Sequence, residues 1–452
     1  MNKEKQYVSV FDLNGRPKFS EALPLAIQHV VAMIVGCVTP SLIIAQVADL
    51  SPEAKIILIQ AGLTMSALTT FLQLFPIGKK NGFQLGSGLP MIMGISFAYL
   101  PSMQAIAESN DVATILGSMI VGGLVAVIVG LFMKKIQKFF PPLIAGTVVF
   151  TIGLSLYPTA VRYMAGGSGN PDFGSWQNWL IALITLAVVT GLNHFAKGFL
   201  KLSSILVGVL VGYVIALAMG MVDFSSVASA GLFQLPKFMY FGIRFDISSC
   251  VALGLLFAIN SVQAIGDFSA TTSGGMDRQP TGRELQNGVV GYGLSNMVSA
   301  LFGGLPSATY SQNVGIVATT KVINRGVFGL AGVIILIAGL VPKFSAILTT
   351  IPSCVLGGAT VSVFASIAMT GIKLIVESEE TLNYRNTSII GLSVALGMGV
   401  TQVADCFVQF PDWVTTIFAK SPTVVATIAA ILLNQLLPKA EQKKAAQTAE
   451  NE

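Results

Sequence analysis

Residues 312–321 read Gln312-Asn313-Val314-Gly315-Ile316-Val317-Ala318-Thr319-Thr320-Lys321 and lie between apolar runs of a very hydrophobic chain. Two amides, two threonines and a lysine at bilayer depth are costly unless they face a cavity lined by protein. The stretch therefore predicts an interrupted membrane segment with a substrate site beside it, which indicates a transporter.

The composition places the chain in a membrane. Of its 452 residues, 53% are hydrophobic and 10% are charged, and the mean hydropathy is +0.75. Soluble domains carry about a quarter charged residues. At about 20 residues per span, the length allows about 12 to 14 helices and no sizeable soluble domain. The net charge of +5 therefore reflects the loops that face the cytoplasm and does not indicate nucleic-acid binding.

The apolar runs predict fourteen transmembrane segments in an all-α polytopic protein. They lie at residues 23–46, 54–78, 88–107, 112–133, 139–159, 176–196, 203–222, 248–272, 286–304, 307–320, 326–346, 351–372, 386–404 and 418–437.

Basic residues predict the orientation, because Lys and Arg are retained on the cytoplasmic side. With the N-terminus inside, most of the 26 basic residues fall in cytoplasmic loops and tails. The six that fall outside are Lys55, Arg162, Lys237, Arg244, Lys343 and Lys420. The three tryptophans, Trp176, Trp179 and Trp413, fall at outer helix ends, where indoles favour the headgroup layer. We expect both termini in the cytoplasm, an inner or plasma membrane location and no cleaved signal peptide.

Segments three and ten are irregular and stand seven segments apart. Segment three contains Gly94-Ile95-Ser96-Phe97-Ala98-Tyr99-Leu100-Pro101, and segment ten contains Pro306-Ser307-Ala308-Thr309-Tyr310-Ser311-Gln312-Asn313. Interrupted segments in corresponding halves are typical of inverted repeats that bind substrate at the midplane. A half-helix after Ser311 would direct free N–H groups at an electron-rich ligand.

Asp267 is the only acidic residue well inside a predicted span, His29 lies in the first span, and both are candidates for ion coupling. An intramembrane carboxylate indicates a coupling ion or a proton, so Asp267 is a candidate for coupling to H⁺ or Na⁺. The alternative is that Asp267 bonds only to backbone exposed at a helix break, and that the His29 imidazole only ties helices together. The cysteines Cys37, Cys250, Cys354 and Cys406 lack metal-type spacing, and we expect no metal and no cofactor.

Residues 312–321 also resemble a family signature. The pattern Gln-Asn, any residue, Gly, four residues, Thr and a basic residue is that of the nucleobase–ascorbate transporter family, also called the nucleobase:cation symporter-2 family. Residues 262–267, Val-Gln-Ala-Ile-Gly-Asp, resemble the eighth-helix motif of its xanthine permease branch, and Gln28-His29-Val30 resembles its opening motif. The likeness extends from about residue 20 to residue 437.

The resemblance implies two inverted seven-segment repeats divided into a core and a gate domain, with short antiparallel strands in segments three and ten. The implied parts are a cytoplasmic N-terminal tail 1–22, core 23–133, gate 139–222, core 248–346, gate 351–437 and a cytoplasmic tail 438–452.

The resemblance also implies a site for a nucleobase. Phe97 would offer a ring face, Gln312 would hydrogen bond to the base, and Ser311, Asn313 and Gln263 would line the site. The motif residues Gly315, Thr320 and Lys321 would be structural. The implied activity is ion-coupled symport, with a proton before sodium, of xanthine or uric acid before guanine or uracil. The implied partners are the base and the lipid bilayer, with no nucleic acid and with a homodimer as the family arrangement.

Two positions depart from the family pattern. Xanthine-type members have a glutamate where this chain has Gln263, and an aspartate in the ninth helix where it has Tyr292. A neutral amide can hydrogen bond to a base but cannot act as a carboxylate. The alternatives are an anion transporter of the sulfate-transporter type on the same fold and a membrane-embedded enzyme. The Gln312–Asn313 pair argues against the first, and two histidines with scattered cysteines argue against the second.

Overall fold

The computed structural model describes residues 9–78, 84–136, 141–167, 169–376, 378, 382–403, 405–411, 414–419 and 421–438. Trp413, Lys420 and the tail from residue 439 lie outside these ranges. The chain forms two compact units, one of residues 1–133 and 158–362 and the other of residues 134–157 and 363–452. The division into core and gate domains stays a prediction.

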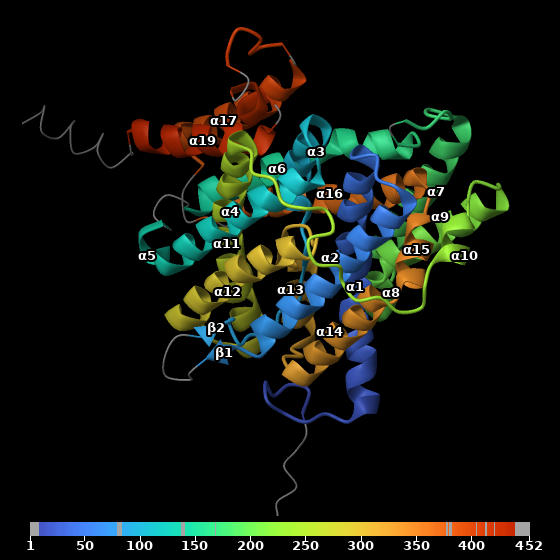
Figure 1. Cartoon of the computed structure of the whole chain (residues 1–452). Helices are drawn as coiled ribbons and strands as arrows, with labels where there is room; N and C mark the ends of the chain where they lie inside the picture. The colour runs from blue at the N-terminus through green and yellow to red at the C-terminus, as the bar shows by residue number, and fades with distance from the viewer. Residues whose placement is uncertain are drawn as a thin grey trace, which may run out of the picture. The chain divides into compact units, whose positions relative to one another are not determined.

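The described residues are mainly helical, and Figure 1 labels the elements. The helices of the first half are α1 Phe19–Val47, α2 Pro52–Leu74, η1 Phe97–Tyr99, α3 Leu100–Ser109, α4 Val112–Leu131, α5 Met133–Ile136, α6 Pro142–Met164, α7 Trp176–Phe195, α8 Gly198–Leu202, α9 Ser204–Ala218 and α10 Ser225–Ser229. Those of the second half are α11 Ile247–Met276, α12 Gly282–Leu301, α13 Ser311–Thr320, α14 Arg325–Leu340, α15 Pro342–Thr349, α16 Ser353–Val376, α17 Tyr384–Gln402, η3 Thr415–Ala419 and α19 Pro422–Leu436. The strands are β1 Ile77–Gly78, β2 Gln84–Leu85, β3 Met93–Ile95 and β4 Ser307–Thr309.

Each of the fourteen predicted segments contains a helix, but the count of fourteen membrane spans is not confirmed. Among the described residues, seven helices are long and apolar enough to cross a membrane: α1, α2, α4, α6, α7, α11 and α16. The α14–α15 pair makes up to eight if it is one span, bent by 78°, and α9 and α19 are apolar but shorter. α12 does not qualify, and its buried polar residues Asn287, Ser295, Asn296 and Ser299 make it less apolar.

Two predicted segments differ from the helices observed. The segment 54–78 ends as helix at Leu74, and Ile77–Gly78 instead pair with Gln84–Leu85 as the strands β1 and β2. The segment 326–346 breaks between Leu340 and Pro342. Prolines explain both, because Pro76 and Pro342 disfavour helical backbone in the residue before them.

Short polar side chains begin several helices. Ser51, Asp111, Ser175 and Asp246 each accept a backbone N–H from the first turn of α2, α4, α7 and α11. At the start of α12, Thr281 and Glu284 form a reciprocal capping box. Such caps satisfy donors that the helix itself leaves free, which fixes where these helices start.

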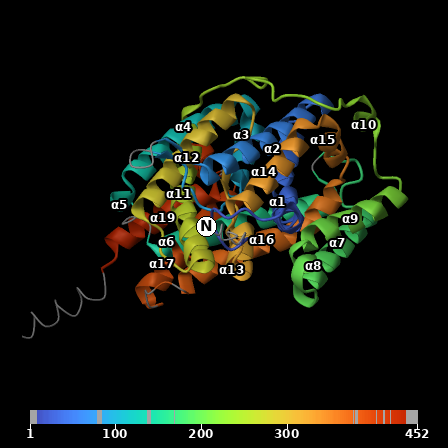
Figure 2. The same cartoon turned by 90° about the horizontal axis from the view of Figure 1, so that it is seen from below.

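Glycines allow close packing of α4 within the first unit, where it lies beside α11 and α12 (Figures 1 and 2). A Cβ atom on Gly123 would lie 2.7 Å from the Gly293 carbonyl oxygen of α12. A Cβ atom on Gly122 would lie 2.2 Å from the Phe257 ring of α11. The glycines of α4 therefore permit close contact with α11 and α12.

The predicted strands of segments three and ten form an antiparallel pair in the first unit. Met93, Gly94 and Ile95 of β3 face Thr309, Ala308 and Ser307 of β4. The antiparallel direction sends η1 and α3 away from one end of the pair and α13 away from the other. The expectation of an extended stretch followed by a half-helix, in both segments, is confirmed.

Side chains from neighbouring helices cover the outer edges of this strand pair. On the β3 side, the Thr70 hydroxyl of α2 accepts the Met93 N–H at 2.9 Å. On the β4 side, the Asn296 amide of α12 accepts the Ser307 N–H at 2.8 Å and donates to the Ser307 carbonyl at 3.2 Å. Unpaired backbone groups are not tolerated in hydrocarbon, so these side chains are what permits a strand pair here.

The N-terminal segment is held against the start of α14 by the buried side chain of Asn324. Its Oδ1 accepts the N–H groups of Gly326 and Val327, and its Nδ2 donates to the carbonyls of Asp12 and Gly15 at 2.8 and 2.9 Å. The backbone N–H groups of Ile323 and Asn324 also donate to the Val10 carbonyl, both at 3.2 Å. One amide thus caps a helix and fixes residues 10–15.

We predict that Asn324→Ala frees the N-terminal segment and destabilises the fold. The substitution removes a helix cap, which costs about 0.5–2 kcal/mol, together with two long-range hydrogen bonds. Hydrogen exchange of the purified protein should show faster exchange at residues 10–16 and a lower melting temperature. Asn14→Ala is the control, since it removes only an exposed contact with Arg325. Equal exchange in both variants would refute the assignment.

Candidate functional site

Asp267 lies in α11 and faces the junction of β4 and α13. The Ser311 hydroxyl donates to its two carboxylate oxygens at 3.1 and 3.2 Å, and the Thr309 hydroxyl donates to it as well. The alternative interpretation gave Asp267 backbone partners, but its partners are two hydroxyls. Both hydroxyls come from the interrupted segment, so the carboxylate is tied directly to the place where the strand becomes a helix.

His29 lies in α1 and is 1% exposed. Asn313 of α13 donates through Nδ2 to the His29 Nδ1 atom and to the His29 carbonyl, both at 3.0 Å. Because a carbonyl can only accept, the Asn313 amide orientation is fixed, and Nδ1 carries the free lone pair. The ring also lies 4.3 Å from the Phe328 ring of α14. His29 therefore ties α1 to α13 and α14, and a part for it in ion coupling stays a prediction.

Asp267 and His29 contact neighbouring positions of the same half-helix, α13. Asp267 contacts Ser311 and His29 contacts Asn313, so α13 is held from α11 on one side and from α1 on the other. The residue between them, Gln312, is exposed, and its side chain makes no hydrogen bond to another described residue. Its part in binding a base stays a prediction.

Two of the three remaining motif residues make contacts within the fold, and a structural role for all three stays a prediction. The Thr320 hydroxyl donates to the Ile316 carbonyl one turn back in α13. Lys321 ends α13 in the left-handed region, with φ of 59°, and its ammonium donates to Asp277 at 2.8 Å. Gly315 is exposed, and a Cβ atom there would meet no described atom within 4 Å. Packing within the described residues does not require glycine at 315.

Phe97 and Gln263 lie on the elements that the sequence assigned to the site. Phe97 begins η1, two residues after β3, and is 6% exposed. Gln263 lies one helical turn before Asp267 on the same side of α11 and is partly buried, and its side chain makes no hydrogen bond to another described residue. Phe97 and Gln312 follow opposite ends of the strand pair. The structure brings together Asp267, Ser311 and Thr309 as one contact group, and His29 and Asn313 as another.

Thr309 and an aromatic cluster were missed as parts of the site. Tyr292, which replaces the acidic residue of xanthine-type relatives, is fully buried, and its hydroxyl is hydrogen bonded to that of Tyr99. The Phe257 ring lies 4.8 Å from Tyr99 and 5.7 Å from Tyr292. A neutral hydroxyl pair thus stands where relatives have a carboxylate. The aromatic Tyr99 beside Pro101 was a signal that sequence reasoning could have used.

Comparisons with known proteins agree with this geometry. A family model described as "Permease family" matches residues 20–406. The chain is 35% identical to the xanthine permease of Bacillus subtilis over 93% of this chain and 94% of that protein. It is 34% identical to the uric acid permease PucJ of the same organism, over 93% of each chain. It is 32% identical to the xanthine permease XanQ of Escherichia coli K12, over 95% of this chain and 94% of that protein.

Two solved structures share the fold. The transmembrane domain of a cyanobacterial bicarbonate transporter, BicA, superposes with a TM-score of 0.56 at 17% identity, over 92% of this chain and 98% of that chain. The murine anion transporter Slc26a9, in its inward-facing state, superposes with a TM-score of 0.61 at 12% identity, over 96% of this chain and 69% of that chain. At these identities the likeness concerns the fold alone.

The family model covers most of the chain, and relatives of more than 30% identity cover nearly all of it. The chain therefore belongs to the nucleobase–ascorbate transporter family of xanthine- and uracil-permease-like proteins, and it is a multi-pass membrane permease and not an enzyme.

Proposed function

We propose that this permease imports an oxopurine base, xanthine or uric acid before guanine or uracil, by symport with a proton. The observation that supports this most directly is the Asp267 carboxylate, held by Thr309 and Ser311 at the start of α13, one residue from the free Gln312 amide. The names of the relatives, xanthine and uric acid permeases, support the same class of substrate.

The position of Asp267 suits a coupling group. A carboxylate at bilayer depth is costly when charged, so a proton or a sodium ion on it lowers the cost of carrying it through the transport cycle. Its contact with Ser311 links its protonation state to the first residue of the half-helix. A bound base that contacts Gln312 would therefore respond to the charge on Asp267.

The residues around Gln312 suit a planar base. An amide offers both a donor and an acceptor, which matches adjacent C=O and N–H groups on a purine edge. At the start of α13, the N–H groups of Asn313 and Val314 donate to the Tyr310 carbonyl. The N–H groups of Ser311 and Gln312 come before these, and such helix-start donors favour electron-rich ligand atoms. Gln263, one turn from Asp267, offers a second uncharged amide.

Alternating access is the proposed mechanism, with the core moving against the gate. In the first unit, α11 and α13 present exposed small residues: Gly266, Ala270 and Ser273 of α11 and Gly315, Ala318 and Thr319 of α13. Surfaces of small residues allow close approach of helices, which shear motions use. A homodimer remains a further expectation from the family.

The test of this function is uptake into vesicles that hold the purified protein. Labelled xanthine, uric acid, guanine and uracil are offered with a proton gradient or a sodium gradient imposed separately. We expect xanthine or uric acid to accumulate under the proton gradient. Accumulation under sodium alone would change the coupling ion. Transport of an inorganic anion without any base would replace the function with that of an anion transporter.

We predict that Asp267→Asn abolishes concentrative uptake, because an amide oxygen in the place of Oδ2 still accepts from Thr309 and Ser311 but the side chain cannot take up a proton. Accumulation in vesicles under a proton gradient should fall to the equilibrium level, while exchange of labelled for unlabelled base continues. Asp277→Asn is the matched control, since it makes the same change on the exposed end of α11. Accumulation by Asp267→Asn at the wild-type level would exclude Asp267 from coupling.

We predict that Gln263→Glu shifts selectivity from uric acid toward xanthine. A carboxylate strengthens hydrogen bonds from N–H donors but repels the urate anion. A hydrogen bond to a charged group exceeds a neutral one by about 1 kcal/mol, which corresponds to about fivefold in the ratio of the two kcat/KM values. Competition uptake measures the ratio, and Gln263→Ala, which should weaken both bases, is the control. An unchanged ratio in Gln263→Glu would place residue 263 away from the base.

A further inference from the structure

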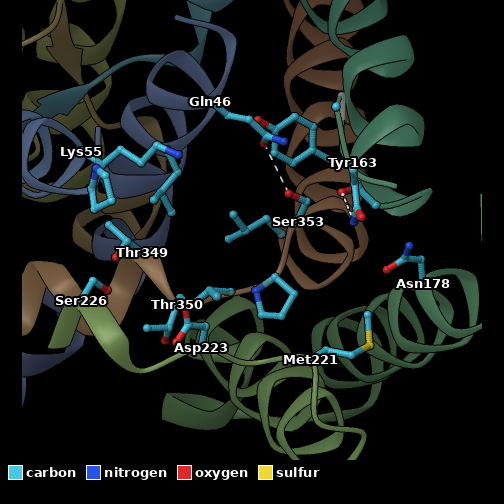
Figure 3. Close-up of a pocket in the computed structure, with 18 of the residues that line it drawn as sticks. Gln46, Lys55, Tyr163, Asn178, Met221, Asp223, Ser226, Thr349, Thr350 and Ser353 are labelled. Carbon is cyan, nitrogen blue, oxygen red and sulfur yellow. Dashed lines mark hydrogen bonds between the residues drawn. The ribbon is translucent and has the colours of Figure 1, made fainter. Parts of the chain in front are cut away.

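A polar cavity lies within the first unit, and no residue of the strand pair lines it. Its volume is about 520 Å³, inside the range of about 300–1,000 Å³ that is usual for small-molecule sites. Its lining comes from the end of α1, the start of α2, the end of α6, the start of α7, the region of α10 and the α15–α16 junction. Figure 3 shows the side chains arranged around the opening.

Side-chain hydrogen bonds hold the walls of this cavity, one of them between elements far apart in the chain. The Ser353 hydroxyl of α16 donates to the Gln46 amide of α1 at 3.3 Å. Asn178 of α7, which is 1% exposed, donates to the carbonyls of Ala165 and Asp172 at 3.2 and 2.8 Å. The cavity therefore has fixed polar walls and is not a gap between loosely packed loops.

One buried polar group in the wall lacks a partner. Tyr163 of α6 lines the cavity and is 4% exposed, and its hydroxyl makes no hydrogen bond within the described part of the chain. A buried hydroxyl without a partner costs about 1–3 kcal/mol. A ligand that offers a carbonyl oxygen or a ring nitrogen would remove that cost.

The cavity also holds one cation and one anion. Lys55 of α2 is the cationic lining residue and Asp223 is the acidic one. Neither makes an ion pair with another described residue. Figure 3 shows the Lys55 side chain extending toward the opening, with Asp223 on another side. The N–H and hydroxyl of Ser225 donate to Asp223 and lower the pKa of its carboxyl group.

The lining residues lie at helix ends that the predicted orientation places on one side of the membrane. They contribute the α1–α2, α6–α7, α9–α11 and α15–α16 connections, which alternate along the chain with the connections assigned to the cytoplasm. Lys55 is one of the six basic residues that this orientation leaves outside. With the N-terminus in the cytoplasm, the cavity therefore opens on the outer side.

We propose that this cavity is an external binding site at which the permease engages an oxopurine, urate above all, before the base reaches the site beside the strand pair. The proposal rests on the proposed function. Urate carries a negative charge for Lys55, carbonyl oxygens for the Tyr163 hydroxyl and N–H donors for Asp223. An uncharged base satisfies Tyr163 and Asp223 but gains nothing from the charge of Lys55.

The test measures initial uptake rates in vesicles for Lys55→Gln and Lys55→Arg, at low and high salt. A mildly acidic pH keeps urate an anion and xanthine uncharged. For Lys55→Gln we expect the KM for urate to rise about two- to fivefold at low salt, as for a partly exposed charge pair, with the maximal rate and the KM for xanthine unchanged. The difference should vanish at high salt, where screening acts. Lys55→Arg should keep the wild-type KM.

Two further variants separate a ligand site from a structural role. Lys343→Gln removes a positive charge on the same predicted side outside the cavity and should leave the urate KM unchanged. Tyr163→Phe should raise the KM of both bases about two- to fivefold without lowering the melting temperature, because it removes a hydroxyl that has no partner in the empty protein.

Three results would overturn the site while leaving the proposed function intact: an equal urate KM in Lys55→Gln and Lys343→Gln, a salt-independent effect, or an unchanged KM in Tyr163→Phe. If the wild-type protein accumulates no base at all, the proposed function itself fails.

Discussion

Hydrogen bonding of the backbone where segments three and ten cease to be helical is the constraint on which the rest of the site depends. Strand backbone at bilayer depth leaves N–H and C=O groups that lipid cannot satisfy. Here β3 and β4 satisfy one another on their inner edges, while Thr70 and Asn296 cover the outer edges. α2 and α12 therefore supply hydrogen-bonding side chains to the strand pair in addition to apolar packing.

The same arrangement determines where the two ionisable residues lie. Because β4 ends at Thr309, the helix that follows begins at Ser311, and its first turn meets Asp267 on α11 and His29 on α1. Each contact gives an ionisable side chain, which is energetically unfavourable in a membrane, a hydrogen-bond partner in the interrupted segment. The position of α13 is thus coupled to a protonatable carboxylate, which is the physical requirement for ion-coupled transport.

The candidate site of this chain has uncharged side chains at two positions where the family pattern has acidic ones. Gln263 and Tyr292 replace two acidic residues of xanthine-type relatives, and Tyr292 is absorbed into an aromatic cluster with Tyr99 and Phe257. Asp267 is then the carboxylate that contacts the interrupted segment. Under the proposed function, a site with fewer negative charges repels an anionic base less, which agrees with the role proposed for Lys55.

The sequence by itself determined the class of protein and the two interrupted segments, whereas the count of fourteen spans stays a prediction. Hydropathy and proline placement depend on local composition, so the half-helix after Ser311 and the extended residues around Gly94 could be predicted. Prolines at 76 and 342 were visible in the sequence, but whether a proline ends, bends or merely occupies a helix depends on packing, and these two breaks were missed. The resemblance to the family signature implied a base contact for Gln312, and that role stays a prediction.

Only the tertiary structure decided the partners. Each of these groupings joins residues that are distant in the chain: Thr309 with Asp267, Asn313 with His29, Thr70 and Asn296 with the strands, and Lys55, Asp223 and Tyr163 around one cavity. Such pairs depend on helix rotation and on angstrom-scale distances, and one sequence carries no signal for either. The physical reason is that hydropathy records how much of a helix is apolar, whereas the chemistry of this site depends on which few polar atoms face one another.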